Sequence, residues 1–443
     1  MTGTQFEQLD FLLIPLTPIH IGGGDTVSLG RENYRVNGTF LERVNLRKLL
    51  LREINSGRNP GILRGAFQEQ VFNNLRDRAH KEDIEETIEL SEATAHELTK
   101  TKGRQGVVNA FQRSGDAPVL PGTSLKGVLR TSCLAHFAED LHSVGPPPSK
   151  IQNKELNQKA FRLNKPNDTD GDPMRDMTVS DIKIPAKATR VDQVHTWKRN
   201  EGQYSFDTTG QMHWERLRCV ADGGEPVMLK VKIGFRSKEV QNVRRSKDAS
   251  KVPQTSDLSF PILLKAAEAQ HRPVWERDIS KFFEGENNKR LNTVLKCISH
   301  LHLSGPDPDG ALIRIGRGSH AEVKSVEKFR SIHRPQAKGA GKYAKEGNTR
   351  HVIKIGGVPI TFGWALLVRV DRWSPPPNWL TASSAVRPGS SKTMRFRKGD
   401  RVIVSGEEAI LYEDLIEGMR EVNVDFDGDI EPVDPSDIEG FNQ

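Results

Sequence analysis

The sequence lacks the motifs on which several classes of protein depend. Its three cysteines, Cys133, Cys219 and Cys297, lie far apart and form no Cys-x-x-Cys pair, which argues against a disulfide framework or a cysteine zinc site. Neither a Walker motif (Gly-x-x-x-x-Gly-Lys-Ser/Thr) nor a Gly-x-Ser-x-Gly elbow occurs, so nucleotide-cofactor binding and serine hydrolysis lack support. No apolar run near the N-terminus is long enough for a signal or a membrane span. We therefore expect a cytoplasmic protein with no membrane partner, no metal and no other cofactor.

Charge is segregated along the chain. Residues 404–443 contain thirteen Asp or Glu and one Arg, a balance of −12, and because the whole chain carries +7, residues 1–403 carry +19. A body this basic is typical of nucleic-acid-binding proteins, although a solvated charged surface gives the same composition. The acidic segment is interpreted as a soluble tail, a docking surface for a basic neighbour, or a screen against non-specific RNA.

Residues 118–130 combine the features of an anion-binding helix start. A Pro-Gly pair predicts a turn, and Thr123 or Ser124 is a suitable N-cap for the helix that follows. The first turn of a helix offers unpaired N–H groups and the positive end of the dipole, which suit a phosphate. Lys126 and Arg130 are four residues apart and share one face. We predict that this segment holds an RNA backbone.

Two glycine-rich segments follow predicted strands and resemble each other. Residues 22–24 are three consecutive glycines, which allow a backbone or ligand to approach closely, or form a tight hairpin. Residues 315–318 read Ile-Gly-Arg-Gly, inside a stretch (314–354) with eleven Lys or Arg against three Asp or Glu. This basic stretch is interpreted as a flexible loop that orders on RNA, with a merely solvated loop as the alternative.

Strands and helices are interspersed without regular βαβ spacing, which favours an α+β fold. Strands are expected over 11–15, 34–44, 177–184, 227–235, 312–315, 351–355, 360–370 and 401–404. Helices are expected over 46–54, 124–141, 262–283, 289–301 and 407–419, a largely helical stretch over 56–116 and an exposed loop over 149–176. Prolines at 375–377 indicate a linker, which divides the chain into a region 1–373 and a small acidic unit within 374–443.

Three segments together resemble the RAMP superfamily, the RNA-binding proteins of CRISPR–Cas effector complexes. They are Thr-Pro-Ile-His-Ile-Gly-Gly-Gly at 17–24, Leu-Pro-Gly-Thr-Ser-Leu-Lys-Gly-Val-Leu-Arg at 120–130, and Arg-Ile-Gly-Arg-Gly at 314–318. The spacing from the first segment to Tyr34 and to the leucines at 46–51 is most similar to the type III-A Csm-complex subunit that caps the head end of the backbone filament.

The resemblance implies a modified ferredoxin-like (RRM-like) core with helical and loop insertions at about 56–116, 144–176, 237–303 and 317–350. It also implies binding of the guide RNA towards its 3′ region, help in maturing or protecting that end, and contact with target RNA and other type III effector subunits. Carried over by motif, the RNA-binding residues are Gly22, Gly23, Gly24, Ser124, Lys126, Arg130, Arg314 and Arg317.

Slicing backbone relatives in this family have a catalytic Asp in a loop after the early glycines. This makes Asp25, with His20, the alternative catalytic residues, and slicing would require Mg²⁺. The sequence around Asp25 is more similar to the capping subunit, which generally lacks that activity. We therefore expect a non-catalytic subunit, with an endoribonuclease, a backbone subunit of a divergent type III subtype and a protein-interaction scaffold as alternatives.

Overall fold

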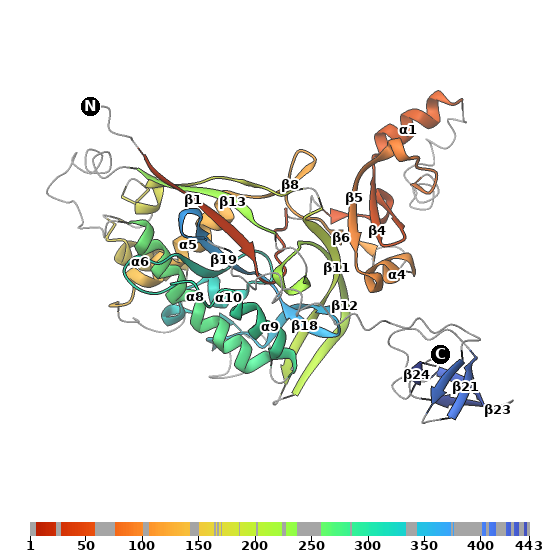
Figure 1. The fold of residues 1–443 in the computed structure, drawn as a ribbon. Coiled ribbons are helices and arrows are strands. Elements are labelled where there is room, and N and C mark those ends of the chain that lie inside the picture. The colour runs from red at the N-terminus through yellow and green to blue at the C-terminus, as the bar shows by residue number, and fades with distance from the viewer. Residues whose placement is uncertain are drawn as a thin grey trace. The chain divides into compact units, whose positions relative to one another are not determined.

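The computed structural model divides the chain into two compact units, Met1–Val386 and Arg387–Gln443 (Figure 1). It describes residues 6–440 except 24–27, 58–75, 101–105, 142–149, 164, 166–167, 170, 186, 201–202, 224–226, 237–257, 284–285, 334–342, 374, 376–400, 405–406, 413–421, 427–428 and 434–437. Gly24, Asp25 and residues 237–257 of the third predicted insertion thus lie outside the described residues.

A five-stranded antiparallel sheet forms the centre of the first unit, in the order β14–β19–β1–β13–β9 (Figure 1). Its strands are β1 (Phe6–Pro15), β9 (Met177–Val179), β13 (Leu229–Arg236), β14 (Gly310–Arg314) and β19 (Trp364–Arg369). With α5 (Gly122–Phe137) and α8 (Phe260–Phe282), the chain order β1–α5–β9–β13–α8–β14 is a β-α-β-β-α-β succession, modified because β19 lies between β14 and β1. The predicted α+β class and core are confirmed.

Around the second half of β1, both faces of this sheet are buried. Phe11 and Leu13 of β1 belong to a cluster that includes Leu125 of α5 and the first half of α8. The alternate residues, Leu12 and Ile14, belong to a second cluster on the other side. Because residues 11–15 of β1 are buried on both faces, this half of the strand is a continuous apolar run rather than an alternating one.

α8 covers the free edge of the sheet at β14. The Oε2 atom of Glu268 accepts a hydrogen bond from the backbone N–H of Leu312 at 2.7 Å. The Nδ1 atom of His271 accepts one from the N–H of Arg314 at 3.3 Å. An edge strand otherwise presents unpaired backbone groups, so these contacts fix β14 and the turn that follows it.

A second, nine-stranded sheet is built on a long hairpin of β11 (Thr189–Asn200) and β12 (Gln203–Leu217). The order is β2–β6–β12–β11–β5–β4–β3, with β17 also paired to β11 and β18 to β17. The other strands are β2 (Ser28–Leu29), β3 (Tyr34–Asn37), β4 (Phe40–Val44), β5 (Ile84–Leu90), β6 (Val108–Asn109), β17 (Thr349–Ile355) and β18 (Val358–Thr361). The sequence did not predict the central hairpin.

The remaining elements surround these two sheets. The other helices are α1 (Leu46–Asn55), α4 (Glu92–Lys100), α6 (Lys150–Ala160), α9 (Glu286–Lys296) and α10 (His320–Lys324). The smaller strands are β7 (Arg113–Ser114), β8 (Ala117–Leu120), β10 (Ile182–Lys183), β15 (Ile332–His333) and β16 (Tyr343–Ala344). Short 3-10 helices span Arg31–Asn33, Lys81–Asp83, Pro173–Asp176, Val220–Asp222, Glu327–Phe329 and Val370–Arg372.

Several local predictions were right and several were wrong. Helix α1 begins after Asn45, whose side chain accepts a hydrogen bond from the N–H of Lys48 as expected of an N-cap. The single strand expected over 34–44 is instead the hairpin of β3 and β4, turned at Gly38 with a φ of 58°. The largely helical stretch over 56–116 was wrong, because its described part contains β5, β6 and β7 beside α4. The loop over 149–176 was also wrong, because α6 occupies much of it.

The basic stretch 314–354 was expected to be a flexible loop. Its described part instead forms α10, β15, β16 and most of β17, while residues 334–342 lie outside the described residues.

The second unit is a five-stranded antiparallel sheet in the order β23–β22–β21–β20–β24. Its strands are β20 (Arg401–Val404), β21 (Glu407–Leu411), β22 (Val422–Phe426), β23 (Asp429–Val433) and β24 (Ile438–Gly440). A small core of Val402, Val404, Ala409, Leu411, Val422 and Val424 is buried on one face. The helix predicted over 407–419 was therefore wrong at its start, and its continuation over 413–419 is not described.

Candidate nucleic-acid interface

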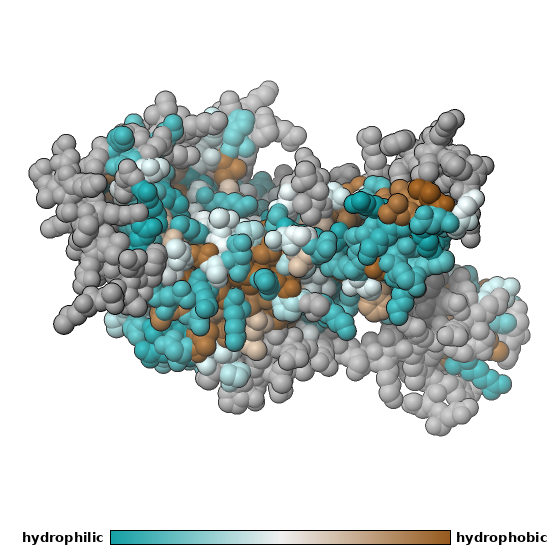
Figure 2. Space-filling model, turned by 90° about the horizontal axis from the view of Figure 1, so that it is seen from above, coloured by the Kyte–Doolittle hydropathy of each residue, from teal (hydrophilic) through white to brown (hydrophobic). Residues whose placement is uncertain are grey.

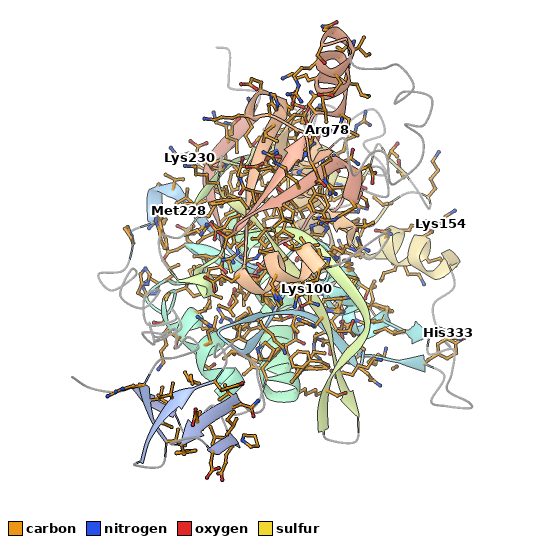
Figure 3. The ribbon with its side chains drawn as sticks, turned by 90° about the vertical axis from the view of Figure 1, so that its right-hand side faces the viewer. Arg78, Lys100, Lys154, Met228, Lys230 and His333 are labelled. Carbon is orange, nitrogen blue, oxygen red and sulfur yellow. The ribbon has the colours of Figure 1, made fainter. Side chains whose placement is uncertain are left out.

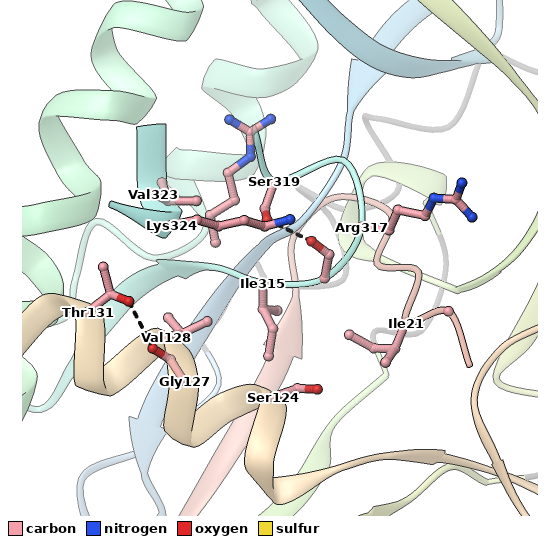
Figure 4. A pocket seen from close by; sticks show the side chains of 13 residues that line it. Ile21, Ser124, Gly127, Val128, Thr131, Ile315, Arg317, Ser319, Val323 and Lys324 are labelled. Atoms are coloured by element: carbon pink, nitrogen blue, oxygen red, sulfur yellow. Dashed lines mark hydrogen bonds between the residues drawn. The ribbon is translucent and has the colours of Figure 1, made fainter. Parts of the chain in front are cut away.

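The three segments that carry the family resemblance line one pocket of about 580 Å³, which we call the central pocket (Figure 4). Its lining residues are Ile21, Gly22, Ser124, Gly127, Val128, Thr131, Arg314, Ile315, Gly316, Arg317, Ser319, Val323 and Lys324. Segments almost 300 residues apart in the sequence therefore meet at one place. Gly23 directly follows the lining residue Gly22.

Backbone contacts hold the first and third segments together. The N–H of Arg317 donates to the carbonyl of His20 at 2.8 Å. Gly363 bridges the two segments, because its carbonyl accepts from the N–H of Ile315 at 2.8 Å and its N–H donates to the carbonyl of Pro18 at 2.7 Å. Gly316 has a φ of 90°, and a Cβ atom at this position would lie 2.5 Å from the His20 carbonyl oxygen. Only glycine tolerates both the positive φ and the short distance to this carbonyl oxygen. Gly316 therefore allows the two backbone segments to approach closely.

One face of α5 forms a wall of the central pocket. Ser124, Gly127, Val128 and Thr131 follow the i, i+3, i+4, i+7 spacing of a single helical face. Gly127 is exposed, and a Cβ atom placed on it would meet nothing within 4 Å. The missing side chain therefore leaves open space on the pocket side of the helix.

The start of α5 differs from the prediction. The helix begins at Gly122 after Pro121, so neither Thr123 nor Ser124 is its N-cap. The N–H of Gly122 donates to Oδ1 of Asp181 at 2.7 Å, which occupies the first free amide of the helix. Gly122 is also tightly packed, because a Cβ atom there would lie 2.3 Å from the carbonyl oxygen of Val179.

Lys126 and Arg130 do lie on one helical face, but that face is not among the lining of the pocket. The Nζ of Lys126 donates to the carbonyl of Met177 at 2.7 Å, and burial lowers the pKa of this amine. Arg130 forms an ion pair with Asp172 at 2.6 Å. Both cations thus have partners within the protein, and their predicted contact with RNA stays a prediction.

Arg314 lines the pocket but its guanidinium is buried. Nη1 of Arg314 contacts Oδ2 of Asp278 at 2.7 Å, and the other oxygen of Asp278 contacts Arg350 at 2.6 Å. Nε of Arg314 donates to the carbonyl of Phe362 at 2.9 Å. These contacts suit Arg314 to anchoring the turn at Gly316, with its charge compensated inside the protein.

Arg317 and Lys324 are both exposed and, among the residues that the structure describes, neither forms an ion pair with a carboxylate. The guanidinium of Arg317 lies 5.0 Å from the ring centre of Trp214, and its Nη1 donates to Oδ1 of Asn109 at 3.3 Å. The pKa of Lys324 is lowered by partial burial and then by the charges of Arg314 and Arg317. Uncompensated positive charge of this kind favours an anion.

Sequence reasoning missed Lys324, Gly127 and Thr131. Gly127 and Thr131 were recoverable, because they share one helical face with Ser124. Lys324 is one of eleven basic residues in 314–354, and nothing in the sequence distinguishes it from the others.

His20, the alternative catalytic residue, is fully buried beneath the first glycine segment. Its Nδ1–H donates to the carbonyl of Glu215 at 2.7 Å, and its ring stacks on Trp214 with the ring centres 4.9 Å apart. Burial lowers its pKa to about 4, so the imidazole is neutral near pH 7. Its predicted partner Asp25 lies outside the described residues, and within the described part of the chain no three His, Cys, Asp or Glu side chains are grouped as metal ligands.

The fold and pocket define an α+β protein with a β-α-β-β-α-β core and a basic, glycine-lined cavity. The model of the RAMP superfamily matches residues 13–245, which is more than half of the chain, and the chain belongs to that superfamily.

Two solved structures have a similar fold. A chain of the Csm–crRNA–target RNA ternary complex of a type III-A CRISPR–Cas system is 14% identical, with a TM-score of 0.55, and the match covers 81% of this chain and all of that one. Csm5 of T. onnurineus is 16% identical, with a TM-score of 0.52, and the match covers 80% of this chain and 99% of Csm5. No curated protein matches the sequence. None of the helices in the described part of the chain is both long and apolar enough to cross a membrane.

Proposed function

We propose that this chain is a guide-RNA-binding subunit of a type III CRISPR–Cas effector complex and that the central pocket binds the RNA backbone. The observation that carries the proposal is the position of Arg317 and Lys324, two cations without a carboxylate partner among the described residues, where the three family segments meet. Membership of the RAMP superfamily and the similarity to a chain of a Csm–crRNA–target RNA complex support it.

The finer part of the proposal is that the subunit caps the backbone filament in the cytoplasm and holds the 3′ region of the guide without cutting RNA. Its partners are then the guide RNA, the target RNA and the other effector subunits. The spacing of the first segment supports this assignment, as does the fold shared with Csm5. The burial of His20 favours a structural role for this side chain over proton transfer in the pocket.

A salt titration of RNA binding tests the pocket. The variant Arg317→Gln/Lys324→Gln removes two charges, and each lost phosphate contact lowers the slope of log K against log salt by about 0.7 for a single strand. We therefore expect the slope to become shallower by about 1.4 and the affinity to fall most at low salt.

Two matched pairs of substitutions make this result specific. Lys230→Gln/Lys232→Gln removes the same charge from two exposed residues of β13 that do not line the pocket, and should leave the slope almost unchanged. Figure 3 shows the position of Lys230. Lys126→Gln/Arg130→Gln tests the sequence-based prediction for α5, where both cations already have partners. Equal slopes for the pocket pair and the β13 pair would refute the pocket as the RNA site.

Asp25 lies outside the described residues, so the slicing alternative is tested by activity rather than by geometry. The assembled complex is incubated with labelled complementary RNA and Mg²⁺, with wild-type protein or Asp25→Ala. A specific cut that the substitution abolishes would overturn the non-catalytic part of the proposal. Purification of the complex free of nucleic acid would instead favour a protein-interaction scaffold.

A further inference from the structure

We propose that the central pocket holds one unstacked nucleotide of the bound RNA, with its base beside Gly127 and its flanking phosphates at Arg317 and Lys324. The inference rests on the proposed function, because it names the part of the RNA that the same site takes. The pocket volume of about 580 Å³ is in the range that encloses a small organic ligand and exceeds what a backbone phosphate alone occupies.

The lining of the pocket combines apolar and positively charged side chains, which complement the base and the phosphates of a nucleotide. Ile21, Val128, Ile315 and Val323 supply apolar surface. In Figure 4, Ile315 lies between α5 and Ile21, and Arg317 and Lys324 come from the segment above it. A nucleotide within a strand has an apolar base face and a phosphate on each side, so two separate cations and an apolar floor complement it. Proteins that bind single-stranded RNA commonly hold bases that are splayed out of the stack.

Gly127 is the strongest evidence for a bound base. A glycine in the interior of a helix costs about 1 kcal/mol relative to alanine. Gly316 and Gly122 each have a local reason for glycine, the positive φ of the first and the backbone packed against the second. Gly127 is not among the glycines with a positive φ, and apart from its chain neighbours and the backbone of its own helix, no described atom lies within 4 Å of its added Cβ. The space that this glycine preserves lies on the pocket face of α5, where a ligand can use it.

Three hydroxyl groups line the pocket, and one of them is available to donate a hydrogen bond to a ligand. The hydroxyl of Thr131 donates to the carbonyl of Gly127 at 3.0 Å, and that of Ser319 donates to the carbonyl of Gly316 at 2.6 Å. The hydroxyl of Ser124 has no hydrogen-bond partner among the residues described by the structure. It lies one turn before Gly127 and is positioned to bind a base edge or a ribose hydroxyl.

The test compares Gly127→Leu with Gly127→Ala in the full chain. Alanine places one atom in the space assigned to the base, so its RNA affinity should fall below that of the wild type, but by less than that of the leucine variant. Leucine fills the space, and we expect its RNA affinity to fall about tenfold, a change of about 1.4 kcal/mol. The probe is a set of single-stranded RNAs with 2-aminopurine at successive positions, whose emission rises when that base leaves the stack. We expect a rise at one position with the wild type, a smaller rise at that position with Gly127→Ala, and none with Gly127→Leu.

The outcomes separate this inference from the proposed function. Unchanged affinity and an unchanged emission profile for Gly127→Leu would overturn the base pocket, while the salt titration of Arg317→Gln/Lys324→Gln would still test backbone binding. Failure of the wild type to bind any RNA would overturn the proposed function itself. A third outcome is that free AMP or UMP displaces the RNA while no 2-aminopurine position in the bound RNA rises in emission. This outcome would assign the pocket to a free nucleotide and would also refute the inference. If Gly127→Leu does not fold, Thr131→Leu fills the same face from the next turn.

Discussion

Asp278 is the buried group on which the geometry of the central pocket most depends. Its side chain is 2% exposed and contacts Arg314, which is 0% exposed, at 2.7 Å and Arg350, which is 3% exposed, at 2.6 Å. Arg350 also contacts Glu322 at 3.1 Å, whereas the other hydrogen bonds of Arg314 to described residues go to the neutral oxygens of Phe362, Gly318 and Thr361. Asp278→Asn preserves the shape of the side chain but leaves Arg314 buried without a compensating charge.

We expect this substitution to lower the free energy of unfolding of the first unit by about 4 kcal/mol, since breaking a buried ion pair costs about 3–5 kcal/mol. Urea unfolding followed by tryptophan fluorescence measures this directly. All six tryptophans precede residue 387, so the signal reports the first unit and not the C-terminal sheet. The change should appear as a lower midpoint with an unchanged slope.

Asp307→Asn is the matched control. Asp307 also contacts two arginines, Arg369 at 2.8 Å and Arg372 at 2.9 Å, but its side chain is 47% exposed. Exposed ion pairs contribute about 0–1 kcal/mol, so this variant should unfold almost as the wild type does. Equal losses in the two variants, or a loss for Asp278→Asn below about 1 kcal/mol, would refute the argument that burial makes this carboxylate essential.

Two further predictions concern stability. Because the pKa of His20 is about 4 in the folded protein and 6.5 in the unfolded chain, the unfolded chain binds more protons as pH falls from 6.5 to 4, and stability decreases over that range. At pH 5 this histidine should cost about 2 kcal/mol relative to pH 7.5, and His20→Gln should remove that part of the loss in urea unfolding; identical pH profiles would contradict it. Gly122→Ala should destabilise by about 1–3 kcal/mol because its Cβ meets a carbonyl oxygen. Gly127→Ala should instead stabilise by up to about 1 kcal/mol, and melting temperatures shifted in the same direction would contradict this contrast.

The sequence predicted the elements whose patterns are set by local chemistry or by complete burial. β1 from Phe11 onward and β19 up to Val368 are apolar because both of their faces are buried, and α1 begins at Leu46, where the helix over 46–54 was expected. The β11–β12 hairpin has no such signature. Arg216 in β12 is 1% exposed and pairs with Asp192 and Asp222, so buried charged residues made these strands look like a surface segment.

Long-range pairing decided the elements that were wrong. Glu407–Leu411 is acidic at its start and was expected to be helical, but it pairs with both β20 and β22, and tertiary context overrides propensity. In the site, helical spacing correctly placed Lys126 and Arg130 on one face of α5. It could not reveal that Met177 and Asp172, about 40 to 50 residues away, face that side. The partners of a cation decide whether it is available to RNA, and they are distant in the sequence.

Neither the hydropathy of the surface nor the net charge locates the RNA site. On the face shown in Figure 2, hydrophilic side chains lie between separate groups of hydrophobic ones. Positive charge is widespread in residues 1–403, which carry +19. What distinguishes the central pocket is the combination of two uncompensated cations, an open helical glycine and two glycine-bearing segments in contact.

Crosslinking of RNA within the assembled complex shows whether the RNA lies in the central pocket. RNA containing 4-thiouridine is bound, irradiated and digested, and the crosslinked peptides are identified by mass spectrometry. We expect adducts on the peptides that contain Ile21 and Gly22 and on those that contain residues 315–324, and we expect these adducts to be lost in Arg317→Gln/Lys324→Gln. Adducts confined to other peptides, with the pocket peptides unmodified, would contradict it.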